Sequence, residues 1–137
     1  MYQDENELFY LIDSGIDQFK KAEGFKKGIK VSKSPNTDWH IFNWRQLTWQ
    51  ENTVSYLIEI YPNFNENKEI ISWTLYTAAY YDSNKKRYYV KYSFAEKTSL
   101  NFIAENIVKL LVDSYKFIIT IPKSEIPFAV NIGQSSS

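Results

Sequence analysis

The sequence has 137 residues, a length typical of a single domain. Its 16 Lys and Arg balance 16 Asp and Glu, and this zero net charge disfavours a general nucleic-acid binder, which normally carries a basic surplus. The absence of Cys excludes disulfides, thiolate metal sites and a cysteine nucleophile. The unusual feature is the aromatic content, because Phe, Trp and Tyr make up 18% of the residues.

The first predicted element is an amphipathic helix over residues 5–22. Apolar side chains recur in this segment at steps of three and four residues, which is the spacing of one helix face. Asp4 suits the N-cap position, and Glu7 three residues later completes a pair typical of a capping box. Gly24 is the expected end of the helix.

Five β-strands are expected next, because five segments are rich in β-branched and aromatic residues and are separated by turn-forming residues. The predicted strands are residues 28–33, 39–50, 54–61, 69–81 and 87–94. The second strand carries aromatic side chains of both parities, and a bulge near Arg45 and Gln46 would bring them to one face. The fifth strand alternates strictly, with one face made of Tyr88, Val90, Tyr92 and Phe94.

A second helix is predicted over residues 99–116, with Thr98 or Ser99 as its N-cap. The β-branched segment 117–122 that follows fits either a last helical turn or a short edge strand. Phe102 lies on the otherwise polar side of this helix, where either the C-terminal residues or a partner would cover it.

The order of elements is helix, five strands, helix, which indicates an α+β fold with an antiparallel sheet in a single domain over residues 1–132. Residues 133–137 are expected to form a disordered tail. Five strands at a spacing of about 4.8 Å make a sheet roughly 20–24 Å wide, and two helices side by side cover about that width. We therefore expect both helices on one face of the sheet and an open face opposite them.

This open face is the first candidate for a binding surface, because the strands carry large apolar residues of both parities. The residues expected to contact a partner are Leu57, Glu59, Tyr61, Trp73, Leu75, Arg87, Tyr89 and Lys91. Aromatic anchors of this kind often carry most of the binding energy of an interface. The competing interpretation is that the sheet curls around these side chains or that the C-terminal segment covers them.

These features favour a non-enzymatic protein-binding module that uses its open sheet face or a sheet edge to hold another protein or a second copy of itself. In the order of its elements alone, the chain resembles compact bacterial proteins of the toxin-immunity, inhibitor and secretion-chaperone kind. No apolar run reaches the ~18 residues of a membrane helix, and no signal peptide is visible. We therefore expect a cytoplasmic protein with no membrane partner.

A second hypothesis is a small-ligand binder or an enzyme with an aromatic pocket. The residues predicted to line this pocket are His40, Trp44, Arg45, Trp49, Tyr56, Glu59 and Trp73. A carboxylate such as Glu59 among aromatic rings either acts as an acid or base or pairs with a cross-strand Arg or Lys. One His gives neither a metal site nor a catalytic triad, and the four Gly lack phosphate-loop spacing, so we expect no metal and no cofactor.

A third hypothesis concerns the segment 85–92, which mixes basic and aromatic residues on a strand. This composition is typical of platforms that bind single-stranded nucleic acid. The glycine-containing RNP-type motif is missing, and Lys85 and Lys86 fall at a predicted hairpin tip where polar residues are common. A nucleic-acid partner is therefore the least favoured of the three hypotheses.

Overall fold

The computed structural model describes residues 5–24, 28–33, 43–51, 54–82 and 88–119, with the backbone alone for residues 23–24, 81–82 and 88–92. The strands are β1 (Lys30–Lys33), β2 (Arg45–Glu51), β3 (Val54–Phe64), β4 (Ile70–Asp82) and β5 (Tyr88–Thr98). The helices are α1 (Glu5–Phe19), α2 (Leu100–Glu105) and α3 (Ile107–Ile119). A short π-helical segment, Lys20–Gly24, extends α1.

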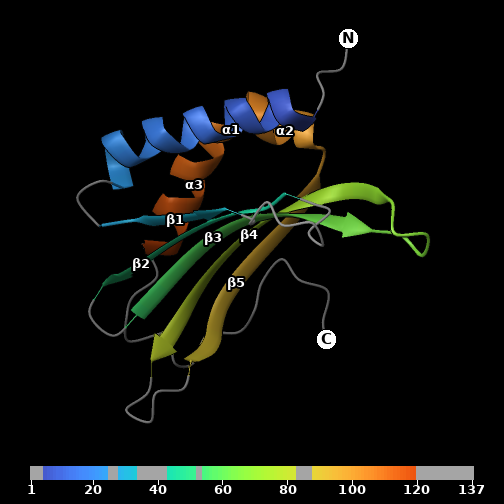
Figure 1. Cartoon of the computed structure of the whole chain (residues 1–137). Coiled ribbons are helices and arrows are strands. Elements are labelled where there is room, and N and C mark those ends of the chain that lie inside the picture. Colours follow the sequence, from blue (N-terminus) through green and yellow to red (C-terminus); the bar gives the residue numbers. More distant parts are fainter. Residues whose placement is uncertain (1–4, 25–27, 34–42, 52–53, 83–87, 120–137) are drawn as a thin grey trace.

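The five strands form one antiparallel sheet in the order β1-β2-β3-β4-β5, so that each strand pairs with its neighbours in the sequence. Figure 1 shows the three helices on one side of this sheet. The predicted α+β fold with an antiparallel sheet and helices on one face is therefore confirmed. The described helices include none that is long and apolar enough to cross a membrane.

The predicted second helix is divided into α2 and α3 by Asn106, whose backbone N–H donates to the carbonyls of Phe102 and Ile103. Its predicted N-cap is confirmed, because Ser99 Oγ accepts a hydrogen bond from the Phe102 backbone N–H at 3.1 Å. The described part of the segment 117–122 is helical, since α3 continues to Ile119.

The register of the sheet decides one open alternative and corrects one prediction. The bulge near Arg45 and Gln46, one of two possibilities for the second strand, does not form, because β2 pairs with β3 without interruption over the whole of β2. The strict alternation expected for the fifth strand is wrong. Tyr92 pairs with Ala79, whereas Val90 pairs with the adjacent Tyr80, so β5 contains a bulge that inverts the alternation at this point.

The hydrophobic core lies between the sheet and the helices. Alternate side chains of β2, β3 and β4 point into this core and are covered by the helices. Trp73 and Leu75 of β4 are each 5% exposed and belong to this core. The Trp73 ring lies edge-on against Phe9 of α1, with ring centroids 5.4 Å apart. The expected position of Trp73 and Leu75 on the open face is therefore wrong, because the register with β3 turns them towards the helices.

Close packing against α3 and polar contacts with β2 hold α1 over this core. Gly15 lies so close to Ile107, the first residue of α3, that a Cβ atom at position 15 would stand 3.1 Å from Ile107 Cβ and Cγ1. At the sheet, Asp13 accepts hydrogen bonds from Arg45 Nε at 2.7 Å and from Arg45 Nη2 at 3.1 Å. The guanidinium of Arg45 also lies 4.5 Å from the centre of the Phe9 ring. These contacts fix the position of α1 relative to both α3 and β2.

Candidate functional site

The face of the sheet opposite the described helices, which we continue to call the open face, carries a cluster of tyrosines around Glu59. Backbone pairing places Glu59 opposite Tyr76 and brings Tyr61 and Tyr80 onto neighbouring positions of the same face. Each of these four side chains is half-buried. The predicted positions of Glu59 and Tyr61 on the open face agree with this arrangement.

The acid–base behaviour of the cluster follows from its burial. Burial raises the pKa of the Glu59 carboxyl above its ordinary value, although a hydrogen bond from Gln46 Nε2 at 3.1 Å lowers it by a smaller amount. Burial also raises the pKa of Tyr80, and a hydrogen bond with Tyr76 and the nearby Glu59 raise it further. In both groups, therefore, burial makes the charged form less favourable than it is in water.

Lys91, Arg87 and Arg45 are the basic residues that the sequence offers as cross-strand partners of Glu59, and of these side chains the structure describes Arg45, which does not pair with Glu59. Arg45 lies on the helix side of β2, where Asp13 and the Trp44 carbonyl accept its hydrogen bonds. Glu59 is on the opposite face and accepts from the neutral Gln46 instead. The register of β2 with β3 decides this outcome, because it places Gln46 directly opposite Glu59.

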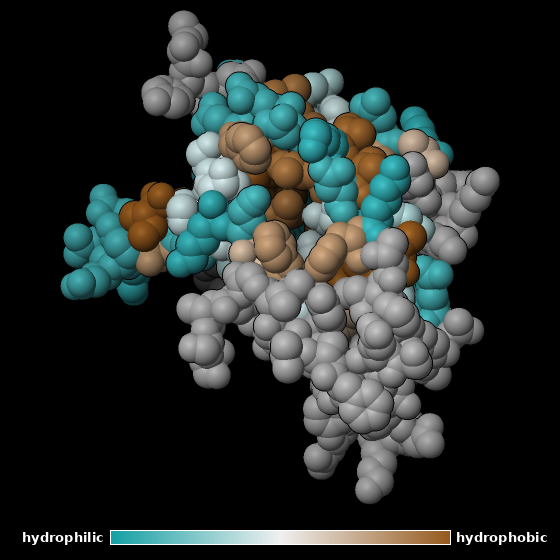
Figure 2. Space-filling view, turned by 180° about the vertical axis from the view of Figure 1, so that it is seen from behind, coloured by the Kyte–Doolittle hydropathy of each residue, from teal (hydrophilic) through white to brown (hydrophobic). Residues whose placement is uncertain are grey.

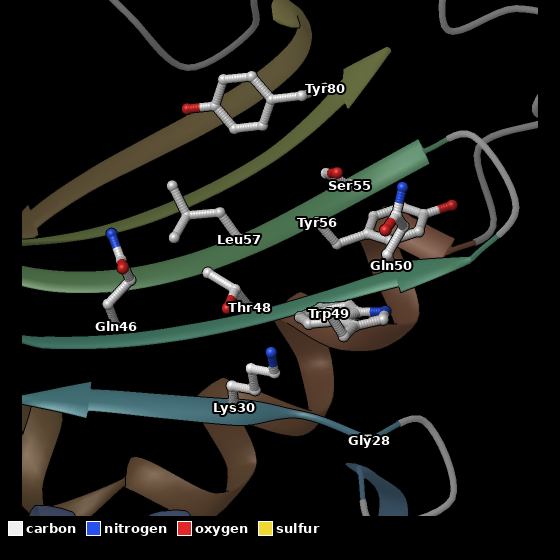
Figure 3. Close-up of a pocket in the computed structure, with 10 residues that line it drawn as sticks. All are labelled: Gly28, Lys30, Gln46, Thr48, Trp49, Gln50, Ser55, Tyr56, Leu57 and Tyr80. Atoms are coloured by element: carbon white, nitrogen blue, oxygen red, sulfur yellow. The ribbon is translucent and has the colours of Figure 1, made fainter. Parts of the chain in front are cut away.

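Beside this cluster the open face is hollowed by a cavity of about 630 Å³, which we call the open-face cavity. Figure 3 shows the residues that line it, which come from β1, β2, β3 and β4 and, in the case of Gly28, from the turn before β1. Its polar lining side chains are Lys30, Gln46, Thr48, Gln50, Ser55 and Tyr80. Leu57, which is 8% exposed, supplies an apolar wall.

The predicted aromatic pocket assembles only in part. Trp49 and Tyr56 stack on each other with ring centroids 5.2 Å apart and both line one end of the open-face cavity. They are 5% and 7% exposed, so most of their surface is used in the core. Trp44 and Arg45 lie at the opposite end of β2 and do not line this cavity.

Several of the predicted site residues lie outside the part of the chain that the structure describes. His40 and Arg87 lie outside the described residues, as do the side chains of Tyr89 and Lys91. The nucleic-acid platform predicted over residues 85–92 falls in the same segment, and the disordered tail predicted over residues 133–137 also lies outside the described ranges.

A second concave surface lies on the helix side, where three phenylalanines from three elements converge. Phe94 of β5, Phe102 of α2 and Phe117 of α3 are 41%, 44% and 38% exposed. They line a cavity of about 390 Å³ whose floor includes Leu75 and Leu110, and we call this surface the phenylalanine groove. Figure 2 shows apolar side chains gathered in a hollow on the rear face of the molecule, bordered by hydrophilic ones.

Charged side chains border the phenylalanine groove. Lys109 Nζ lies 2.8 Å from Asp113 Oδ2 in an exposed ion pair, which raises the pKa of the Lys109 ammonium. Glu96 also lines the groove and makes no ion pair within the part of the chain that the structure describes. Among the described lining residues, negative charges therefore outnumber positive ones by one.

The sequence pattern singles out Phe102 as an anomaly but not Phe94 or Phe117. It places Phe94 on one face of the fifth strand and Phe117 in a segment that fits either a helix or a strand. The exposure of Phe94 could have been inferred from the position of β5 as the last strand of the sheet. Two helices are least able to cover a strand at the sheet edge.

Comparisons with known protein families, with curated proteins and with solved structures find no match to this chain. Within the described residues, no group of three or more His, Cys, Asp or Glu side chains is placed to hold a metal ion. The two concave surfaces are therefore the candidate functional sites of this protein.

Proposed function

We propose that this protein is a non-enzymatic protein-binding module, which holds an extended segment of another protein beside β5 and in the phenylalanine groove. The observation that carries this proposal is the convergence of three well-exposed phenylalanines around one cavity at a sheet edge. Large apolar side chains gathered in this way are typical of protein interfaces.

The position of the groove favours an extended partner. β5 ends the sheet, and the described residues supply no strand on its outer side. A segment that pairs with the Ser93–Thr98 part of β5 would satisfy these backbone groups and place every second side chain on the helix side. Those side chains would meet Phe94 and Phe117, whose ring centroids are 6.3 Å apart.

The charge of the groove favours a basic side chain in the partner. Asp113 is already paired with Lys109, which leaves Glu96 as the acidic group open to a cation from outside. The partner segment is therefore expected to combine alternating apolar residues with a Lys or Arg. The charged group contributes selectivity, whereas the phenylalanines contribute most of the affinity.

A random peptide library displayed on phage tests the proposal, because it samples many candidate segments at once. Peptides enriched on the full chain should alternate apolar residues and carry a basic residue. Their affinity should fall roughly tenfold for Phe94→Ser or Phe117→Ser. The matched control is Ile71→Ser, which removes an apolar side chain that is 64% exposed on the projecting β3–β4 hairpin. Equal binding to all three variants contradicts the proposal.

Sedimentation of the chain alone separates a foreign partner from a second copy. We expect a monomer, because the proposed occupant comes from another protein. A dimer that Phe94→Ser dissociates would show that the groove binds a second copy of the chain, and this result would overturn the choice of a foreign partner.

A further inference from the structure

The open-face cavity lies on the side of the sheet opposite the phenylalanine groove and is not used by the proposed function. Its volume of about 630 Å³ falls within the range of ~300–1,000 Å³ that is typical of small-molecule sites. It is built on β1, β2, β3 and β4, so hydrogen-bonded strands fix the relative positions of its lining residues. A ligand here would meet a preformed surface.

The polar groups that line this cavity are available to a ligand. Within the described residues, the side chains of Lys30, Thr48, Gln50 and Ser55 make no hydrogen bond and no ion pair. Figure 3 shows the Lys30, Thr48 and Gln46 side chains rising from adjacent strands towards the same space. Gln46 has its Nε2 engaged by Glu59, which fixes its orientation and leaves its carbonyl oxygen free.

The lining selects the chemical class of the ligand. Amides and hydroxyls both donate and accept hydrogen bonds, so a ligand with several hydroxyl groups can pair with each of them. Among the described residues, no carboxylate lines the cavity to attract a cation, and Lys30 is the one cationic group, which provides little charge for a strongly anionic ligand. Leu57 and the ring of Tyr80 supply an apolar surface suited to the C–H face of a sugar ring.

We infer that the open-face cavity binds a neutral, polyhydroxylated ligand, a short carbohydrate, through the amides of Gln46 and Gln50, the hydroxyls of Thr48 and Ser55 and the apolar surface of Leu57. This site is separate from the proposed protein-binding groove, because the two lie on opposite faces of the sheet. Binding at one site does not require binding at the other.

Amide NMR spectra of the full chain, titrated with maltose, cellobiose or diacetylchitobiose, test this inference. At least one disaccharide should shift signals of open-face residues in β2 and β3 in a saturable manner. Thr48→Val, which removes the hydroxyl while keeping the shape, should weaken this binding roughly tenfold because it leaves a ligand hydroxyl unpaired. The matched control Thr98→Val alters a threonine outside the cavity and should leave the affinity unchanged.

The outcomes are decisive in both directions. Saturable shifts on the open face that Thr48→Val weakens and Thr98→Val does not support the carbohydrate site. Absence of saturable binding by all three disaccharides, or shifts that Thr48→Val leaves unchanged, overturns it. Peptide binding in the phenylalanine groove should be the same for Thr48→Val and the unmodified chain, so failure of one proposal is distinguishable from failure of the other.

Discussion

The contact between Gly15 and Ile107 leads to a prediction that opposes helix propensity. Gly15 is in the interior of α1, where Ala is normally more stable than Gly by about 1 kcal/mol. In this structure an added Cβ would stand 3.1 Å from Ile107 Cβ and Cγ1 and closer still to Cγ2, whereas ordinary van der Waals contact begins at 3.4 Å. Gly15→Ala should therefore destabilise the fold.

The magnitude follows from the surroundings of the contact. Ile107 is 5% exposed and lies in the core, so it cannot move into solvent to make room. Adding a methyl group to a well-packed interior costs about 1–3 kcal/mol, and the clash here involves three atoms of one branched side chain. This close approach places the cost in the upper part of that range, so after the gain of about 1 kcal/mol in helix propensity is subtracted we expect a net loss of up to about 2 kcal/mol in the free energy of unfolding.

A double-mutant cycle measured by urea unfolding tests this reasoning. Ile107→Ala alone should cost about 2–5 kcal/mol because it leaves a cavity. In the double variant the new methyl group of residue 15 occupies part of that cavity. The loss of stability in the double variant should therefore be smaller than the sum of the two single losses by about 1–3 kcal/mol. If Gly15→Ala stabilises the protein and the cycle shows no coupling, the close packing of α1 on α3 is refuted.

Three further predictions concern other parts of the fold. Asp13→Asn should cost about 1–3 kcal/mol in urea unfolding, because it leaves the buried guanidinium of Arg45 without its charged partner; an unchanged stability would contradict this role. Ser99→Ala should cost about 1 kcal/mol through loss of the N-cap, which thermal unfolding measures. Glu59→Gln should raise stability at pH 7, and this advantage should shrink as the pH falls through the raised pKa of Glu59 and vanish below the ordinary carboxyl pKa. The sign follows because the pKa of Glu59 is higher in the folded state than in the unfolded state, so that ionisation of Glu59 destabilises the fold. A gain in stability that does not change with pH would contradict this prediction.

The sequence was sufficient to predict the elements, because their signals are local. The apolar periodicity of α1 and the capping residue Ser99 each require only neighbouring residues, and both predictions agree with the structure. The break at Asn106 had no comparable signal, since neither Pro nor Gly marks it. At the break the Asn106 side chain donates a hydrogen bond from Nδ2 to the Phe102 carbonyl at 3.0 Å.

The faces of the strands were harder to predict, because β4 carries large residues of both parities. Trp73 and Tyr76 are equally plausible core residues by composition, and the pairing of β4 with β3 decides between them. The candidate surfaces depend on the same long-range information. The phenylalanine groove exists because α3 packs on β3 and β4, which leaves Phe94 of β5 partly exposed.

The meander topology has a consequence for the way in which the chain folds. Each strand pairs with its neighbour in the sequence, so the sheet can grow by successive hairpins with little loop-closure entropy. The contact of Gly15 with Ile107, in contrast, joins the first described helix to the last. Because the ribosome makes α1 before the sheet and α3 after it, the core closes only when α3 has been synthesised. Until then the apolar face of the sheet lacks the side chains that α2 and α3 contribute to the core, and this interval is the one in which the nascent chain is most exposed to aggregation.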